Sequence, residues 1–264
     1  MASLSANCIT QGVIIGTTKE QEWLLPWWWF HYRLYNTYPV TFIDFGDMSE
    51  KSIEWCKKRG GVIKLAVQPD FVAPREKVAP ELVTLWESIH PQMWFIRKTW
   101  YKKPFAMLQS PYRRTIWLDL DCQTRGSLKP LFEFNLGSSG ITLAAEDQVS
   151  QDHNLKRTIT IPGEIAYNAG VVVFDRDSSL LKEWTQQCIH QSHLFFGDSQ
   201  LLSRMIMTQK IAFNPLPTTY NWVVSWGLNS NALILHWSGS SKAFIENQIE
   251  FFGKGCLIDL TKVP

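Results

Sequence analysis

Two aspartates one residue apart, Asp119 and Asp121, directly follow a run of apolar and β-branched residues at 115–118. The run predicts a buried strand, and side chains two residues apart on an extended chain point to the same side. The two carboxylates can therefore face one cation together. Oxygen ligands suit Mn²⁺ or Mg²⁺, which commonly link protein carboxylates to substrate phosphates. The alternative is that one aspartate caps the next turn while the other is solvated.

A histidine and two lysines could complete such a site. His236 follows the apolar run 233–235, so it lies at the end of another predicted strand, where a neutral imidazole can bind a metal. Lys242 could neutralise charge that develops on a departing diphosphate. Lys103 precedes Pro104, which favours the first turn of a helix, and the free N–H groups of a helix start attract anions. An ordinary structural or solvent-exposed role is the alternative for each of them.

The elements that must position these residues alternate along the chain. Strands are predicted at 12–16, 40–44, 62–67, 115–118, 141–144, 170–174, 211–213 and 233–235. Helices are predicted at 27–35, 49–59, 81–100, 104–109, 178–188 and 199–208. This alternation predicts an α/β fold with a mainly parallel central sheet flanked by helices. Because no linker or internal repeat is visible, residues 1–264 are predicted to form a single domain.

Five segments of the chain occur in the order found in one enzyme family. They are KPFAMLQSP at 103–111, TIWLDLD at 115–121, YNAGVVVF at 167–174, GDSQLL at 197–202 and HWSGSSK at 236–242. Their content and order resemble the GT-A glycosyltransferases, especially the family-8-like enzymes. The resemblance spans most of the chain from the first strand onward. It implies a Rossmann-like GT-A domain that binds a nucleoside-diphosphate sugar.

The resemblance also implies a metal and phosphate site. Asp119, Asp121 and His236 correspond to the metal ligands, and the implied ion is Mn²⁺ or Mg²⁺. Gly239 and Lys242 correspond to contacts with the diphosphate. Lys242 thereby becomes a candidate catalytic residue as well as a binding residue.

Further positions are implied to hold the rest of the donor. The family holds the nucleoside at the positions of Gly16, Thr17 and Asp44. Four more donor contacts are expected at Lys103, Asp147, Asn168 and Gly170. The Asn168 amide can donate and accept hydrogen bonds with sugar hydroxyls, and Gly170 permits a close approach of the backbone. A simple turn is the alternative for the last two residues.

The reacting sugar is expected near Asp198 or Gln200. Asp198 directly precedes the predicted helix 199–208, so helix capping is its simplest role. In the resembling enzymes the corresponding loop faces the reacting sugar, and its aspartate is directly followed by glutamine. Here Ser199 separates the two candidate catalytic residues, which leaves open which side chain faces the anomeric carbon.

The expected function is metal-dependent transfer of a hexose from a nucleoside-diphosphate sugar, a UDP-sugar, to a saccharide, lipid-linked or protein acceptor. In an inverting reaction Asp198 would take the acceptor proton, whereas the family-8 resemblance favours retention, which needs no such base. One alternative is a nucleotidyltransferase with the same metal site, although Gly16-Thr17-Thr18 is a poor phosphate-binding loop. The other is a non-catalytic protein that binds a sugar nucleotide and a partner.

Composition narrows the classes of partner. A net charge of +2, from 26 basic and 24 acidic residues, does not indicate nucleic-acid binding. The five cysteines form no CxxC pair, which predicts a reducing, cytoplasmic location. No transmembrane segment is predicted from the sequence. The aromatic cluster at 27–30 favours core packing, with a partner surface as the alternative.

Overall fold

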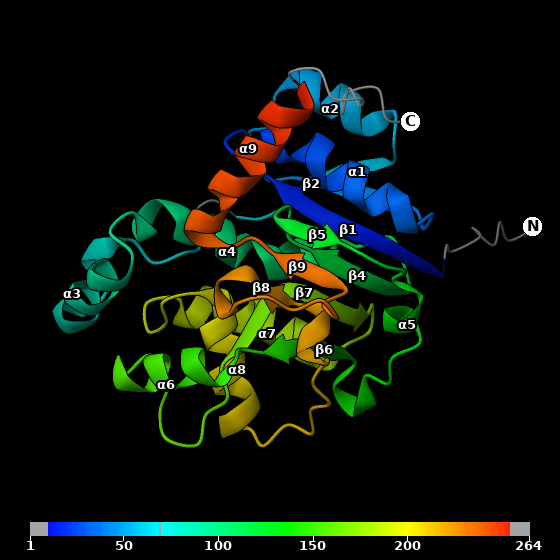
Figure 1. Cartoon of the computed structure of the whole chain (residues 1–264). Coiled ribbons are helices and arrows are strands. Elements are labelled where there is room, and N and C mark those ends of the chain that lie inside the picture. The colour runs from blue at the N-terminus through cyan, green and yellow to red at the C-terminus, as the bar shows by residue number, and fades with distance from the viewer. Residues whose placement is uncertain (1–9, 69, 254–264) are drawn as a thin grey trace, which may run out of the picture.

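A computed structural model describes residues 10–68 and 70–253 of the chain (Figure 1). At its centre lies a sheet of six strands in the order β3-β2-β1-β4-β7-β6. The strands are β1 (Gln11–Thr17), β2 (Val40–Asp44), β3 (Gly61–Lys64), β4 (Arg114–Leu118), β6 (Ile141–Ala145) and β7 (Tyr167–Asp175). Neighbouring strands from β3 to β4 pair in parallel, and β7 runs antiparallel to both β4 and β6. The predicted α/β fold with a mainly parallel sheet is confirmed.

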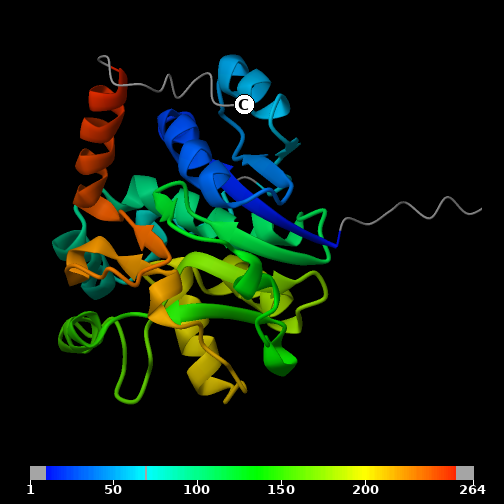
Figure 2. The same ribbon diagram turned by 45° about the vertical axis from the view of Figure 1, so that its right-hand side comes forward.

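Helices cover both faces of this sheet (Figure 2). They are α1 (Leu25–Tyr35) and α2 (Glu50–Lys57) on one face, and α4 (Met93–Leu108), α7 (Ser179–Gln191) and α8 (Asp198–Thr208) on the other. The continuous apolar runs require this cover, because strands such as β1 present apolar side chains to both faces. Trp27 and Trp28 of α1 are fully buried against the sheet. This part of the aromatic cluster therefore belongs to the core.

A second, smaller sheet extends from the first at the end of β4. It contains β5 (Cys122–Thr124), β9 (Ile234–His236) and β8 (Trp222–Val223) in the order β5-β9-β8. β5 begins directly after Asp121 and pairs antiparallel with β9, so that Cys122 lies opposite His236. The small sheet thereby brings the middle of the chain beside its C-terminal part.

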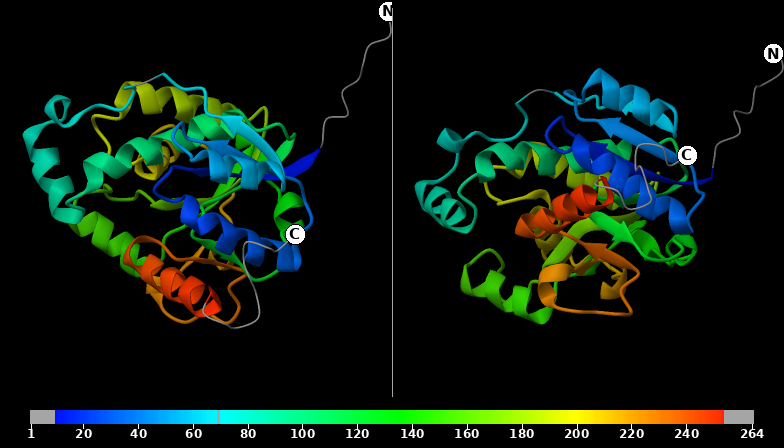
Figure 3. Two further views of the ribbon diagram at one scale, coloured as in Figure 1. Left: turned by 90° about the horizontal axis from the view of Figure 1, so that it is seen from above. Right: turned by 45° about the horizontal axis from the view of Figure 1, so that its top comes forward.

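The helix α9 (Lys242–Gly253) follows the small sheet and lies beside α1 (Figure 3). The Trp27 indole Nε1 donates a hydrogen bond to Oε1 of Gln248 at 2.9 Å, and Ile245 is fully buried in the same core as α1. This packing fixes the start of α9, and with it Lys242, against the main domain.

Two predictions about helices are corrected. The helix predicted at 81–100 is two helices, α3 (Pro80–Ile89) and α4, because Pro91 disfavours helical geometry in the residue before it. Pro104 does not begin a short helix but lies inside α4. Lys103 therefore sits within a continuous helix, and the expected anion-binding helix start is absent from this position.

The strand predicted at 211–213 is also wrong. These residues have irregular structure, although Ile211 and Phe213 both pack against the core on the α7 side of the sheet. The short apolar run at 211–213 gave a strand-like signal, but Ile211 and Phe213 pack against the core without a backbone ladder.

The remaining elements connect these layers. They are α5 (Lys129–Phe132), α6 (Gln148–Lys156) and the short 3₁₀ helices η1 (Glu22–Leu24), η2 (Arg75–Lys77), η3 (Gly137–Ser139), η4 (Thr218–Tyr220), η5 (Val224–Trp226) and η6 (Gly239–Ser241). None of the helices in the described part of the chain has the length and apolar character that crossing a membrane requires.

Candidate active site

A cavity of about 910 Å³ lies where the carboxyl ends of β1 and β4 meet the starts of α8 and α9. Ligands of α/β proteins bind in this kind of crevice, because the carboxyl ends of parallel strands open there. The polar lining includes Asp119, Asp121, Asp198, His236 and Lys242. Residues that are far apart in the sequence therefore meet in one cavity.

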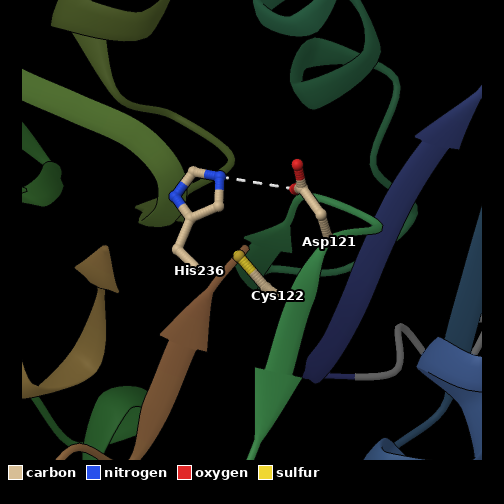
Figure 4. A group of neighbouring side chains, drawn as sticks. All are labelled: Asp121, Cys122 and His236. Carbon is tan, nitrogen blue, oxygen red and sulfur yellow. Dashed lines mark ion pairs between the residues drawn. The ribbon is translucent and has the colours of Figure 1, made fainter. Parts of the chain in front are cut away.

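Three expected metal ligands converge in this cavity. Nε2 of His236 lies 3.3 Å from Oδ1 of Asp121 and 4.0 Å from Oδ2 of Asp119. Figure 4 shows the imidazole of His236 facing the Asp121 carboxylate from the neighbouring strand. Asp121 and His236 are 5% and 4% exposed, so the structure holds both side chains firmly in place.

A chain of hydrogen bonds fixes the orientation of His236. Its Nδ1 lies 3.0 Å from Oδ1 of Asn221, whose amide Nδ2 donates to Oδ1 of Asn168 at 3.0 Å. Asn168 in turn donates from Nδ2 to Oε1 of Glu146 at 2.9 Å, and its Oδ1 also accepts from the Gly170 N–H. Because each amide orientation is set by the next partner, Asn221 presents an oxygen to the imidazole. Nδ1 of His236 therefore carries a proton, and in the neutral ring the Nε2 lone pair points toward the aspartates.

Gly170 makes room for the imidazole. A Cβ atom at this position would lie 2.3 Å from Cε1 and 2.5 Å from Nδ1 of His236, much closer than atoms can approach. Only glycine lets β7 pass directly behind the ring. The structure thus places Gly170 against a proposed metal ligand, where its predicted role was a donor contact.

These ligating atoms fit a hard divalent cation. Neighbouring ligands of an octahedral ion at 2.0–2.1 Å are about 3.0 Å apart, close to the 3.3 Å between Nε2 of His236 and Oδ1 of Asp121. A lone pair that faces two carboxylates is also an arrangement that a cation stabilises. Carboxylate oxygens with one imidazole nitrogen suit Mn²⁺ or Mg²⁺ better than a thiolate-binding metal.

Cys122 is near this group but has a different role. The ligating atoms of Asp121, Cys122 and His236 lie within 4.8 Å of one another. The Cys122 thiol, however, donates to the carbonyl oxygen of Gly170 at 3.6 Å, and burial raises the pKa of the thiol well above its ordinary value. A protonated thiol is a poor ligand for a hard cation, so the structure favours a packing role for Cys122.

Two lysines balance the charge of the aspartates. Nζ of Lys103 lies 3.0 Å from Oδ2 of Asp119, and Nζ of Lys242 lies 2.8 Å from Oδ2 of Asp121. Burial alone would lower the pKa of both lysines, but the facing carboxylates raise it above the ordinary value. Burial would likewise raise the pKa of Asp121, yet the positive charges of His236, when it is protonated, and of Lys242 hold it well below its ordinary value. All three groups are therefore charged at neutral pH.

Asp198 differs from Asp119 and Asp121 because its carboxylate is poorly compensated. The side chain lies at the start of α8, is 3% exposed, and its Oδ2 has no hydrogen-bond partner among the described residues. Burial raises the pKa of Asp198 from 3.8 to about 6, while the positive charge of Lys103 partly opposes the rise. The helix cap that was its simplest role is absent, since Gly197 occupies the N-cap position.

Gln200 lines the cavity, but its amide is occupied. Its Oε1 accepts from the Phe196 N–H at 2.6 Å, and its Nε2 donates to the carbonyl oxygen of Ile159. Ser199, the residue between the two candidates, also lines the cavity. The structure therefore leaves Asp198 and Ser199 as the side chains available at this position.

The other predicted donor contacts fall into two groups. Gly16, Asn168 and Gly239 line the cavity, and Gly239 adopts a positive φ of 60° at the turn before α9. The second group lies outside the cavity lining formed by the described residues and consists of Thr17, Asp44 and Asp147. The Asp44 carboxylate accepts from the N–H groups of the loop after β2, and the Asp147 carboxylate caps α6. These bonds are local, so both aspartates shape loops near the site.

The sequence analysis missed several residues of the site. Glu146 lines the cavity, and Asn221 supports His236 from outside it. Phe45 and Trp117 stack at 6.5 Å with an 8° interplanar angle and line the cavity beside Gly16. A Cβ at Gly16 would lie 2.3 Å from the Phe45 ring. Glu146 lies two residues after the strand predicted at 141–144, and this position near a strand end was the one signal available for it.

The sheet order and the site at its carboxyl edge define a GT-A glycosyltransferase fold. The family model for glycosyl transferase family 8 matches residues 96–247, more than half of the chain. The chain therefore belongs to glycosyl transferase family 8 and is a glycosyltransferase. This finding confirms the resemblance and favours glycosyl transfer over nucleotidyl transfer.

Solved structures show the same fold. The galactosyltransferase LgtC, in complex with donor and acceptor sugar analogs, matches with a TM-score of 0.62 and 14% identity over 94% of this chain and 97% of that chain. Mouse xyloside xylosyltransferase 1 in its apo form matches with a TM-score of 0.54 and 18% identity over 88% of this chain and 99% of that chain. Glycosyltransferase GlyE of Streptococcus pneumoniae TIGR4 matches with a TM-score of 0.54 and 15% identity over 88% of this chain and 56% of that chain. No curated protein matches the sequence.

Proposed function

We propose that this glycosyltransferase moves a hexose from a UDP-sugar to an acceptor, using Mn²⁺ or Mg²⁺ bound by Asp119, Asp121 and His236. The observation that carries the proposal is the convergence of these three ligating groups in one cavity, with Lys103 and Lys242 beside them. A bound divalent ion would offset the negative charge of the donor diphosphate. The donor would lie along the cavity from Gly16 toward Asp198.

The two lysines would assist departure of the nucleoside diphosphate. Lys242 lies at the first turn of α9, directly after the short helix that contains Gly239. A phosphate that replaces part of its contact with Asp121 would gain a charged hydrogen bond from the Lys242 ammonium group. Lys103 is placed between Asp119 and Asp198, so its charge can stabilise negative charge near the reacting sugar.

Asp198 is the group that we assign to the reacting sugar. Its unpartnered Oδ2 and raised pKa give a carboxylate that is ionised near neutral pH but only weakly stabilised by the protein. Such a carboxylate can stabilise positive charge at the anomeric carbon, or accept the proton of the acceptor in an inverting reaction. The anomeric configuration of the product distinguishes these two roles.

The nucleobase would bind beside the first strand. Phe45 and Trp117 stack with nearly parallel rings in the cavity wall next to Gly16, and flat aromatic surfaces of this kind suit a base. Asp44 and Thr17 lie in the same region but behind the cavity wall, and we propose that they position this loop for the nucleoside.

The test is nucleotide release from a panel of UDP- and GDP-hexoses, with and without Mn²⁺, by the full chain. We expect release from one UDP-sugar that requires the metal and is abolished by Asp121→Ala. The matched control is Asp152→Ala, because Asp152 is exposed on α6 and lies outside the cavity lining. If no donor is hydrolysed and calorimetry detects no binding of UDP with Mn²⁺, the proposal is wrong.

A further inference from the structure

One wall of the cavity, beyond Asp198, is aromatic. It is formed by His90, Trp100 and Phe196, which we call the aromatic wall. The Trp100 and Phe196 rings are 5.4 Å apart and tilted by 49°, and the His90 ring meets Trp100 edge-on at 6.3 Å. All three side chains are half-buried, so part of each ring is open to the cavity. The metal and phosphate contacts proposed above do not use them.

The aromatic wall is adjacent to the proposed reaction centre. A Cβ atom on Gly197 would lie 3.4 Å from Cε3 of Trp100, so the indole rests on the backbone directly before Asp198. Phe196 precedes Gly197 in the same segment. A ring bound against Trp100 would therefore place its substituents within reach of the Asp198 carboxylate.

The wall is held rigidly from behind. Arg97 is 1% exposed and donates from Nε to the Phe196 carbonyl oxygen at 3.0 Å and from Nη2 to the Phe195 carbonyl oxygen at 2.9 Å. The same guanidinium lies 4.7 Å from the centre of the Trp86 ring, which is fully buried in a small core of α3 and α4. A rigid aromatic surface loses little conformational entropy when a ligand stacks on it.

Polar groups with free hydrogen-bonding capacity lie on another part of the same cavity. Asn154 of α6 and Arg157 just after it line the cavity, and among the described residues their side chains make no hydrogen bond or ion pair. Figures 1 and 2 show α6 on the same side of the molecule as α3. This part of the cavity therefore combines flat apolar surface with unused polar groups.

We infer that the aromatic wall is the acceptor subsite and that its occupant is a saccharide, stacked through the apolar face of a pyranose ring on Trp100. The inference rests on the proposed function, because it assigns the acceptor of that same reaction. A pyranose has an apolar face and a rim of hydroxyls, which matches aromatic rings beside free amide and guanidinium groups. The cavity of about 910 Å³ lies near the upper end of the range for small-molecule sites, which leaves room beside a donor.

A peptide acceptor would present different chemistry. An extended peptide gains affinity from main-chain hydrogen bonds to a free strand edge. The aromatic wall comes instead from helix α4 and from the segments just after α3 and before α8, and no strand of the described residues contributes to it. The wall thus favours stacking of a ring over pairing with a backbone.

The test uses saturation-transfer NMR on the full chain with UDP and Mn²⁺. The probes are methyl β-D-galactoside, methyl β-D-glucoside, methyl β-D-xyloside and, for a protein acceptor, N-acetyltyrosinamide. Trp100→Ala removes the stacking surface and Trp100→Phe keeps a smaller one. The matched control is Trp55→Ala, since Trp55 is half-buried on α2 and lies outside the cavity lining. Calorimetry of UDP with Mn²⁺ on every variant reports folding and the donor site.

We expect at least one glycoside to bind, with roughly tenfold weaker binding in Trp100→Ala, intermediate binding in Trp100→Phe and unchanged binding in Trp55→Ala. Binding of UDP should stay the same in all variants. The inference is overturned if UDP binds but no glycoside does, if only N-acetyltyrosinamide binds, or if the Trp100 variants bind glycosides like the unaltered chain. If UDP fails to bind while a glycoside signal still depends on Trp100, the proposed function fails and the saccharide subsite stands.

Discussion

At the scale of single residues, Asp198 is a group of the candidate site whose buried charge lowers the stability of the fold. Its carboxylate is buried at the start of α8, and burial raises its pKa to about 6. A raised folded-state pKa means that the protonated carboxyl stabilises the fold at low pH. This contribution is complete below the ordinary value of 3.8 and is lost as the pH rises through about 6. Near neutral pH the ionised group therefore destabilises the protein.

We predict that Asp198→Asn stabilises the chain near pH 8 by on the order of 2 kcal/mol but has little effect near pH 4, because asparagine carries no charge to bury. The same change should abolish transfer. Urea unfolding at both pH values, alongside a transfer assay, measures the two effects. A variant that is less stable near pH 8 would contradict the view that the charge of the Asp198 carboxylate is poorly compensated.

Asn221 is a second residue with a specific expected effect. It is fully buried and links His236 to Asn168. We expect Asn221→Ala to weaken Mn²⁺ binding by roughly 10- to 100-fold, because the imidazole loses the partner that fixes its tautomer. Electron paramagnetic resonance of free Mn²⁺, without any donor, reports the change. Asn214→Ala is the control, since the exposed Asn214 lies outside the cavity lining and its amide donates only to the Asn135 carbonyl oxygen. If both variants bind Mn²⁺ with equal affinity, the hydrogen bond from Asn221 to His236 does not contribute to metal binding.

These two residues also show what the sequence can reveal about a site. The Asp119 and Asp121 pair was found because both carboxylates follow one apolar run, which is a local signal. Asn221 was not found, because its partners His236 and Asn168 come from different strands and no short pattern records that contact. The contact that occupies the Gln200 amide was not predictable for the same reason. Its partner Ile159 lies in a loop that is distant in sequence.

At the scale of elements, α4 connects the small core of α3 to the segment directly before Asp198 and α8. The connection runs through Arg97, which is buried and donates to carbonyl oxygens of the segment before α8. Burial lowers the pKa of Arg97 from its ordinary value. Among the described residues no carboxylate pairs with the guanidinium, and backbone carbonyl oxygens accept its hydrogen bonds instead.

We predict that Arg97→Met destabilises the fold by about 3 kcal/mol, because it leaves several buried carbonyl oxygens without a donor. It should also reduce transfer, since the segment before Asp198 loses its attachment to α4. Thermal unfolding and a transfer assay test both effects. Lys98→Met is the control, because Lys98 is exposed on the same helix. If Arg97→Met unfolds like the control, the carbonyl contacts contribute little.

Element boundaries were predictable where the local chemistry was decisive. β1, β2 and β4 coincide with short, mainly apolar runs. A run of this length and composition is typical of a strand that is buried on both faces of a sheet. The division between α3 and α4 depends on Pro91. The helical pattern on both sides of this proline led to the prediction of a single helix. β5 and β8 contain three and two residues, which is too short for any periodicity, so they exist only because β9 pairs with both.

At the scale of the whole molecule, the proposed donor site joins elements from both sheets. A ligand that binds this site in the folded chain only should raise the midpoint of thermal unfolding. We expect UDP with Mn²⁺, each at about 100 times its dissociation constant, to add about 2.7 kcal/mol of stability and to raise the midpoint by several degrees. Removing the metal with EDTA should cancel most of the shift. A shift of the same size with UDP alone would contradict metal-dependent binding.

The pairing of β5 with β9 has a consequence for folding during synthesis on the ribosome. Asp121 lies near the middle of the chain and His236 near its end, and the small sheet alone brings them together. During synthesis the N-terminal strands emerge first, so the proposed metal ligands stay separated until β9 has left the ribosome. An incomplete chain that ends before β9 would thus carry Asp119 and Asp121 without His236, the third proposed metal ligand.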